Sequence, residues 1–222
     1  MTALASEGID ALAVDLPGHG ADTGPFGDLH SDAARVREVL DHQAGGDVVL
    51  VGHSYGGAVI TEAGGHPAVG RLVYLCAMAL TASETCATVA TGDPAAASIP
   101  HDGRPDLGQA VIPHDDGMIT VDPTLAAACL YNECEPATAA WAVDRLGPQP
   151  MITLQQTPLS VAWLSKRSTY AVCANDLAIP PKLQRIMAAR CTEAVEWESD
   201  HSPFLSHPEL VVRMLAAEAT RA

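Results

Sequence analysis

One serine of this chain lies in a sequence context that activates a hydroxyl group for nucleophilic attack. An apolar, β-branched run at residues 48–51 leads into Gly52-His53-Ser54-Tyr55-Gly56 and then into helix-compatible residues at 58–60. Strand, sharp turn and helix form the order that a nucleophile elbow requires. Gly52 and Gly56 are expected to keep the turn free of side-chain clashes, and the helix N-terminus would favour negative charge near Ser54. An ordinary glycine-rich turn is the alternative.

A nucleophilic serine needs a general base, and the base needs a carboxylate that orients it. His201 follows the last predicted strand directly, so it would lie at the same sheet edge as Ser54. The other histidines lie before or beside the serine, in turns, in the 79–165 segment or at the start of the last helix, where solvated or capping roles suffice. Asp176 ends the preceding strand and is the preferred acid. Asp200 is disfavoured because adjacent residues rarely direct their side chains at each other.

Strands and helices alternate around these residues. Strands are predicted at 9–14, 47–51, 71–76, 168–173 and 193–197. Helices are predicted at 31–43 with Ser31 as a possible cap, from the elbow to about Ala63, from the Pro180-Pro181 pair onward, and at 208–219. This alternation implies an α/β fold, with a mostly parallel sheet and helices on both faces.

Residues 79–165 interrupt this alternation. The segment is rich in Pro, Gly, Ala and Asp, and it contains helical stretches near 123–131 and 136–146 but no convincing strand. We interpret it as a lid inserted into one core domain formed by residues 1–78 and 166–222, since such lids shape pockets and exclude water. A disordered acidic insertion is the alternative, which the apolar and aromatic residues of the segment argue against.

The composition of the chain disfavours several classes of binding partner. The 222 residues carry 27 acidic and 12 basic side chains, a formal net charge of −15. With no basic stripe, nucleic acid and anionic membranes are poor partner candidates. Neither a membrane span nor a signal-peptide pattern is present, and the six cysteines show no C-x-x-C pair or zinc-ligand spacing, so free thiols and a cytoplasmic location are expected.

Four sequence blocks resemble the α/β-hydrolases, in the branch of plant salicylate-binding and methyl-jasmonate methylesterases, hydroxynitrile lyases and their bacterial relatives. The blocks are Val14-Asp15-Leu16-Pro17-Gly18-His19-Gly20, Gly52-His53-Ser54-Tyr55-Gly56-Gly57, Asn175-Asp176-Leu177-Ala178-Ile179-Pro180 with Gln184-Arg185, and Asp200-His201-Ser202-Pro203-Phe204-Leu205. The resemblance implies that Ser54 is the nucleophile, His201 the base and Asp176 its orienting acid. It also implies that the backbone N–H of Tyr55 is one of two oxyanion donors.

The chain departs from this branch at its start. Relatives have two or three strands and a His-Gly loop, which donates the second oxyanion N–H, ahead of the strand predicted at 9–14. Here residues 1–8 resemble the end of the helix that follows that loop. We therefore expect that the first strands are missing, through a misassigned start or a truncated gene, and that an incomplete oxyanion site would lower turnover.

The expected function is hydrolysis of a small carboxylic ester through an acyl-enzyme on Ser54, with no cofactor and no metal. Hydroxynitrile lyases of the branch carry a lysine after the catalytic histidine, whereas this chain has Ser202. Candidate substrate-binding residues, each of which could equally be a core residue, are Met78, Tyr131, Trp141 and Phe204. A lyase or carbon–carbon hydrolase with the same triad and a catalytically impaired ligand-binding relative remain alternatives. A homodimer is left open.

Overall fold

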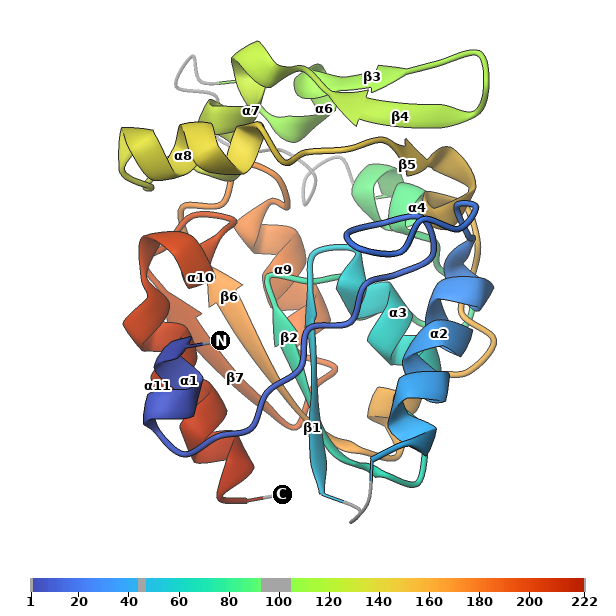
Figure 1. The fold of residues 1–222 in the computed structure, drawn as a ribbon, viewed down its shortest axis with the longest axis vertical. Helices are drawn as coiled ribbons and strands as arrows, with labels where there is room; N and C mark the ends of the chain where they lie inside the picture. Colours follow the sequence, from blue (N-terminus) through green and yellow to red (C-terminus); the bar gives the residue numbers. More distant parts are fainter. Residues whose placement is uncertain (1, 44–46, 93–104, 222) are drawn as a thin grey trace.

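A four-stranded parallel sheet forms the centre of the protein. The computed structural model describes residues 2–43, 47–92 and 105–221 (Figure 1). The strands are β1 (Val48–His53), β2 (Val69–Leu75), β6 (Arg167–Cys173) and β7 (Glu193–Trp197), in the order β1-β2-β6-β7. All three neighbouring pairs are parallel. Four of the five predicted strands are thus confirmed, with bounds that differ by at most a few residues.

Alternate residues of these strands build two apolar layers, because successive side chains of a strand point to opposite faces. Leu72 and Tyr74 join a large cluster that includes residues of α2 (Leu29–Asp41), α3 (Gly56–Ala63) and α9 (Pro181–Ala188). Val73 and Leu75 join a smaller cluster with Val211 of α11 (Pro208–Ala219). Helices therefore cover both faces of the sheet, as predicted, and α1 (Thr2–Ser6) packs against α11 (Figure 1).

The predicted cap of the 31–43 helix was misplaced. Helix α2 begins at Leu29, and its N-cap is Asp28, whose side chain accepts a hydrogen bond from the Ser31 backbone N–H at 2.9 Å. The Ser31 hydroxyl bonds back to Asp28, so the two residues form a reciprocal capping box. The sequence favoured Ser31 because it is the residue nearest the apolar positions of the helix, although Asp28 caps equally well by type.

The strand predicted at 9–14 is wrong. No strand forms there, although Val14 and the nearby Leu16 pack against the larger core cluster. A strand requires a neighbour for its backbone hydrogen bonds, and among the described residues only β2 pairs with β1. Within the described residues the other edge of β1 is therefore open, and Val51 of this strand is 37% exposed.

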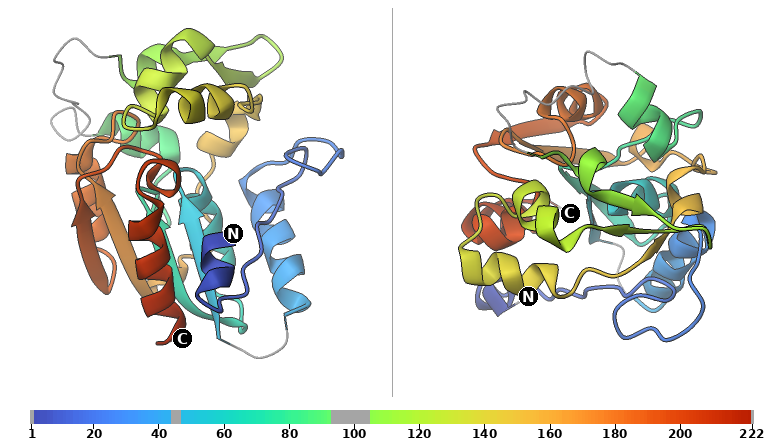
Figure 2. Two further views of the ribbon diagram at one scale, coloured as in Figure 1. Left: turned by 60° about the vertical axis from the view of Figure 1, so that its left-hand side comes forward. Right: turned by 90° about the horizontal axis from the view of Figure 1, so that it is seen from above.

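The segment over the carboxyl ends of the strands contains more strand than the sequence indicated. It comprises α6 (Leu107–Ala110), β3 (Val111–Pro113), β4 (Met118–Val121), α7 (Pro123–Leu130), α8 (Pro136–Val143) and β5 (Gln149–Pro150) (Figures 1 and 2). The two predicted helices are confirmed, but β3, β4 and β5 form an antiparallel sheet that was not predicted. Strands of two to four residues are too short to show an alternating apolar and polar pattern in the sequence. The turn signal Asp116-Gly117 was present, with Gly117 at φ +83°.

Both ends of the predicted 79–165 lid pack into the core instead. Leu80, Cys86 and Val89 at one end and Ala162 and Trp163 at the other belong to the larger core cluster. These ends include α4 (Cys86–Gly92) and the 3₁₀ turns η1 (Met151–Leu154) and η2 (Ala162–Leu164). We call residues 105–150 the lid from here on.

Candidate active site

Ser54 has the strained backbone of a nucleophile elbow. It lies between β1 and α3 with φ +53°, in the left-handed region that non-glycine residues rarely occupy. Its amide donates to the Leu75 carbonyl at 3.4 Å, and its carbonyl accepts from the Met78 amide at 3.0 Å. Strain of this kind persists only where the surrounding structure fixes it, and here hydrogen bonds to β2 and to the segment after it do so.

The glycine requirement of the turn differs in part from the prediction. A Cβ on Gly52 would lie 2.6 Å from the Gly56 carbonyl oxygen, so Gly52 is required for the close approach. A Cβ on Gly56 would meet nothing within 4 Å, whereas one on Gly57 would lie 2.6 Å from the Met78 amide nitrogen. Gly57, rather than Gly56, is therefore the second glycine that close packing requires.

His201 and Asp176 form a buried hydrogen-bonded pair. His201 Nδ1 lies 2.7 Å from Asp176 Oδ2, and both side chains are almost fully buried. The other Asp176 oxygen accepts the backbone N–H groups of Ala178 and Ile179 at 2.7 and 2.9 Å. A carboxylate only accepts, so Nδ1 carries the proton and Nε2 of His201 is left as the basic nitrogen.

Gln184 supports this pair from helix α9. Its Nε2 donates to Asp176 Oδ2 at 2.8 Å and to the Ile179 carbonyl at 2.7 Å, while its Oε1 accepts the Cys173 amide at 2.9 Å. The side chain is fully buried. The sequence analysis included Gln184 in the third block that resembles the family but gave it no role.

Asp200 holds loops together and makes no hydrogen bond with the His201 ring. One oxygen accepts from the Ser202 amide at 3.1 Å and the Ser206 hydroxyl at 2.7 Å, and the other accepts from the Glu133 amide of the lid at 3.1 Å. The Glu133 carboxylate in turn contacts Asn175 Nδ2 at 2.6 Å and His207 Nε2 at 3.1 Å. These contacts fasten the lid to the loops that carry Asp176 and His201.

The side chain of Tyr55 anchors the residue whose backbone N–H is the expected oxyanion donor. Its hydroxyl donates to Asp32 Oδ2 at 2.6 Å. Burial, followed by the hydrogen bond and negative charge of Asp32, raises the pKa of Tyr55, so the phenol stays protonated. Among the described residues, no hydrogen bond from the Tyr55 amide is found, which leaves this donor available.

Three residues near the elbow could in principle hold a metal ion. Ligand atoms of His53, Cys76 and His201 lie within 4.8 Å of one another. However, the His53 ring and the Cys76 thiol both contact the His201 carbonyl, at 2.7 and 3.3 Å. Burial also raises the pKa of the Cys76 thiol well above its ordinary value, whereas zinc requires the thiolate. This arrangement favours hydrogen bonding over metal binding.

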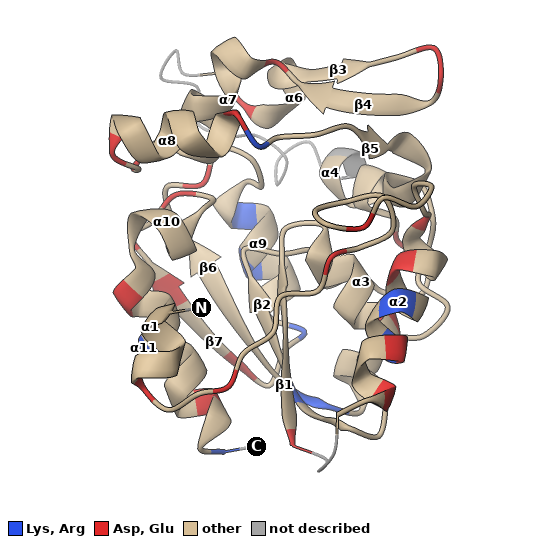
Figure 3. Ribbon diagram, in the orientation of Figure 1, with Lys and Arg blue, Asp and Glu red and all other residues tan. Residues whose placement is uncertain are grey.

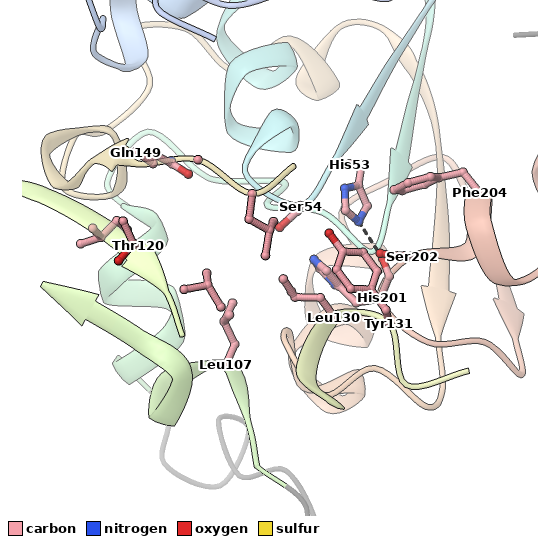
Figure 4. A pocket seen from close by; sticks show the side chains of 14 residues that line it. His53, Ser54, Leu107, Thr120, Leu130, Tyr131, Gln149, His201, Ser202 and Phe204 are labelled. Carbon is pink, nitrogen blue, oxygen red and sulfur yellow. Dashed lines mark hydrogen bonds between the residues drawn. The ribbon is translucent and has the colours of Figure 1, made fainter. Parts of the chain in front are cut away.

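A cavity of about 340 Å³ opens between the elbow and the lid (Figure 4). Ser54 and His201 line it from the core, and Tyr131 lines it from the lid. Its apolar wall consists of Leu107, Ile119, Val121, Leu130, Leu146 and Phe204, and its further polar groups are those of His53, Thr120, Gln149 and Ser202. No lining residue within the described part of the chain is Lys or Arg.

Two of the four expected substrate-binding residues line this cavity, namely Tyr131 and Phe204. Met78 lies outside the lining and packs against the larger core cluster. Trp141 also lies outside it, is 52% exposed, and is covered by the Arg145 guanidinium at 4.3 Å from its ring centroid. The sequence identified aromatic residues of the right segments but could not tell which helix face meets the core.

A family model described as the alpha/beta hydrolase family matches residues 1–214. The chain belongs to this family. The alpha/beta hydrolase nvfD of Aspergillus novofumigatus (strain IBT 16806) is 35% identical over 230 residues, a match that covers 96% of this chain and 86% of nvfD. The family predicted from the four sequence blocks is thus confirmed.

Solved structures of this alpha/beta hydrolase family share the fold. The pyrethroid hydrolase PytH superposes with a TM-score of 0.79 at 24% identity and covers 99% of this chain and 90% of its own. The methylesterase MES16 from Arabidopsis has a TM-score of 0.77 at 20% identity, with coverage of 100% and 91%.

Among the residues that the structure describes, charged side chains do not gather in one part of the fold of this alpha/beta hydrolase. Lys and Arg are dispersed over the described residues, and acidic residues lie on many helices and loops (Figure 3). In the described part of the chain, every helix is too short or too polar to cross a lipid bilayer. All six cysteines are free thiols.

Proposed function

We propose that this alpha/beta hydrolase is a serine esterase that cleaves an uncharged carboxylic ester through an acyl-enzyme on Ser54. The observation that carries the proposal is one shared cavity. Ser54, in an elbow conformation, and His201, whose Nδ1 is bound to Asp176, line the same 340 Å³ space under the lid.

In the acylation step, Ser54 Oγ attacks the ester carbonyl while His201 Nε2 accepts the hydroxyl proton. Asp176 stabilises the resulting imidazolium through its hydrogen bond to Nδ1. The carbonyl oxygen becomes negative and accepts the Tyr55 N–H at the positive end of α3. The carbon–oxygen bond to the alcohol then breaks, and His201 returns its proton to the departing alkoxide.

In the deacylation step, His201 Nε2 removes a proton from water, and the hydroxide attacks the acyl carbonyl carbon. Ser54 leaves as the alkoxide and recovers the proton from His201, which releases the carboxylic acid. The proposed hydrolysis uses the three side chains, the Tyr55 N–H and water.

The lining favours an uncharged, largely apolar substrate. Six apolar side chains face the cavity, and no lysine or arginine among the described lining residues could pair with a substrate carboxylate. The formal charge of −15 further disfavours anions. The cavity volume is near the lower end of the range for small-molecule sites, which fits a small ester. The ester hydrolases among the structural neighbours support the same reaction class.

Intact-mass analysis after fluorophosphonate treatment tests this proposal. We expect a stoichiometric adduct on the wild-type protein and none on Ser54→Ala. An ester panel should then show turnover of neutral short-chain and aromatic esters, with much lower turnover of the same acyl groups carrying a free carboxylate. A soluble wild-type protein that forms no adduct and hydrolyses no ester would overturn the proposal.

A further inference from the structure

His53, the residue before the serine, connects the nucleophile elbow to the loop that carries the base. Its Nε2 lies 2.7 Å from the backbone carbonyl oxygen of His201. Because a carbonyl can only accept, Nε2 must carry the proton and donate it. The His53 ring also packs on the His201 ring at a centroid distance of 4.6 Å and meets the edge of Phe204 at 4.9 Å (Figure 4).

The surroundings keep this donor neutral. Burial, with a smaller contribution from the neighbouring His201, lowers the pKa of His53 to about 3. The ring therefore remains an uncharged single donor at neutral pH, and its hydrogen bond does not place a second cation beside the imidazolium that His201 becomes during the reaction.

The His201 carbonyl has a second, weaker donor in Cys76, the residue that follows β2. Cys76 Sγ lies 3.3 Å from the same oxygen, and the Cys76 backbone is fixed by its amide, which donates to Ala171 at 2.9 Å. The His201 residue is thus held at two places. Asp176 fixes its ring, and His53 with Cys76 fixes its main chain.

We infer that His53 is a positioning residue, whose Nε2–H holds the main chain of His201 so that the imidazole stays aligned with Ser54. This inference rests on the proposed function. Alignment matters because a misplacement of about 1 Å can reduce turnover about a hundredfold. His53 is joined to Ser54 by one peptide bond, so its hydrogen bond sets the base against the nucleophile directly.

The test compares His53→Gln, which keeps an N–H donor of similar reach, with His53→Leu, which removes it. Fluorophosphonate titration counts active sites, and kcat is calculated per titrated site. We expect His53→Leu to lower kcat by about ten- to a hundredfold with KM within about twofold, and His53→Gln to stay within about threefold of wild type. If His53→Leu does not fold, His53→Asn, whose amide is too short to reach the carbonyl, takes its place.

Three results would overturn the inference while wild-type activity stands. One is an unchanged kcat per titrated site in His53→Leu, including the case in which only the number of sites falls, as a purely structural role would give. Another is an equal loss in His53→Gln and His53→Leu. The third is a rise in KM alone. A wild-type protein that neither labels nor turns over esters would instead overturn the proposed function, and this inference with it.

Discussion

Asp176 and His201 are 25 positions apart in the sequence and share a 2.7 Å hydrogen bond, whereas Asp200, the immediate neighbour of His201, makes none with its ring. The two carboxylates are both buried, yet they serve different purposes. Asp176 faces the imidazole, and Asp200 accepts from loop and lid groups. Proximity along the chain is therefore a poor guide to which carboxylate bonds to the imidazole.

Replacing each acid by its amide separates these purposes. Asp176→Asn should lower kcat by roughly 10³- to 10⁴-fold, since an amide no longer holds the Nδ1–H tautomer. Asp200→Asn should keep kcat within about tenfold, because an amide oxygen can still accept from the loop groups. Steady-state kinetics on one neutral ester measures both. The assignment of the acid would be wrong if Asp200→Asn were the more damaged variant.

Removing the amide of Gln184 should destabilise the protein. Gln184→Leu leaves the Cys173 amide without its acceptor and takes one donor from Asp176, and each unsatisfied buried group costs about 1–3 kcal/mol. Urea unfolding gives the change in free energy. Arg185→Ala on the same helix is the control, because its exposed ion pair with Glu196 should contribute less than about 1 kcal/mol. Similar losses of unfolding free energy in both variants would contradict the role of Gln184 in linking Cys173 to Asp176.

The two glycines after the serine should differ in their tolerance of a methyl group. Gly57→Ala forces a Cβ against the Met78 amide and should reduce both thermal stability and the number of sites that a fluorophosphonate labels. Gly56→Ala meets open space and should fold like the wild type. The melting temperature and the labelling stoichiometry of the two variants measure this difference. Equal tolerance at both positions would refute the packing described at the elbow.

Burial of His53 predicts a specific loss of stability in acid. The pKa of His53 is about 3 in the folded protein and near 6.5 when the residue is free of its surroundings. Between these values the unfolded chain binds a proton that the folded chain does not, so the contribution of His53 is complete above pH 6.5 and declines as the pH falls toward 3. The groups that face His53, namely the His201 ring and the Cys76 thiol that donates to the same carbonyl, are unchanged in His53→Gln.

The measurement is the free energy of unfolding of wild type and His53→Gln between pH 7 and pH 4. We expect the wild-type curve to fall more steeply, since glutamine does not titrate. If the free energies of unfolding of the two proteins changed in parallel over this range, His53 would be protonated equally in the folded and unfolded states.

Two aromatic residues of the lid should affect substrate binding differently. Tyr131 lines the cavity, so Tyr131→Ala should raise KM for an aromatic ester several-fold through the loss of buried contact area. Trp141 lies outside the lining, so Trp141→Ala should leave KM within about twofold. Kinetics on matched aromatic and short aliphatic esters tests the pair. A larger effect at Trp141 would mean that the lid closes differently over a bound substrate.

The elements that follow from local sequence periodicity were predictable, and the elements that require pairing with another segment of the chain were not. Strand β7 and helix α11 match the predicted ranges, and Pro208 marks the start of the helix locally. Residues 9–14 have the composition of a strand, but a strand forms only beside another strand. The composition of residues 9–14 cannot show whether a neighbouring strand is available to pair with them.

The same distinction holds for the site. A motif identified Ser54, and position after a strand identified His201 and Asp176, which the structure brings to one sheet edge. Gln184, Asp32 and His53 act through side-chain hydrogen bonds to groups 8, 23 and 148 positions away, and their residue types alone do not reveal these partners. Lid residues depend on which face of a short helix meets the core, which eight residues with little polarity do not specify.

The hydrogen bond between His53 and His201 joins residues 148 positions apart. During synthesis on the ribosome, Ser54 is therefore in place long before His201, its proposed base, exists. Because the His201 loop follows β6 and β7 in the chain, the proposed mechanism leaves Ser54 without its base until both strands have been made. Reactivity of this one serine toward a fluorophosphonate would thus report the completion of folding, and could be used to time it.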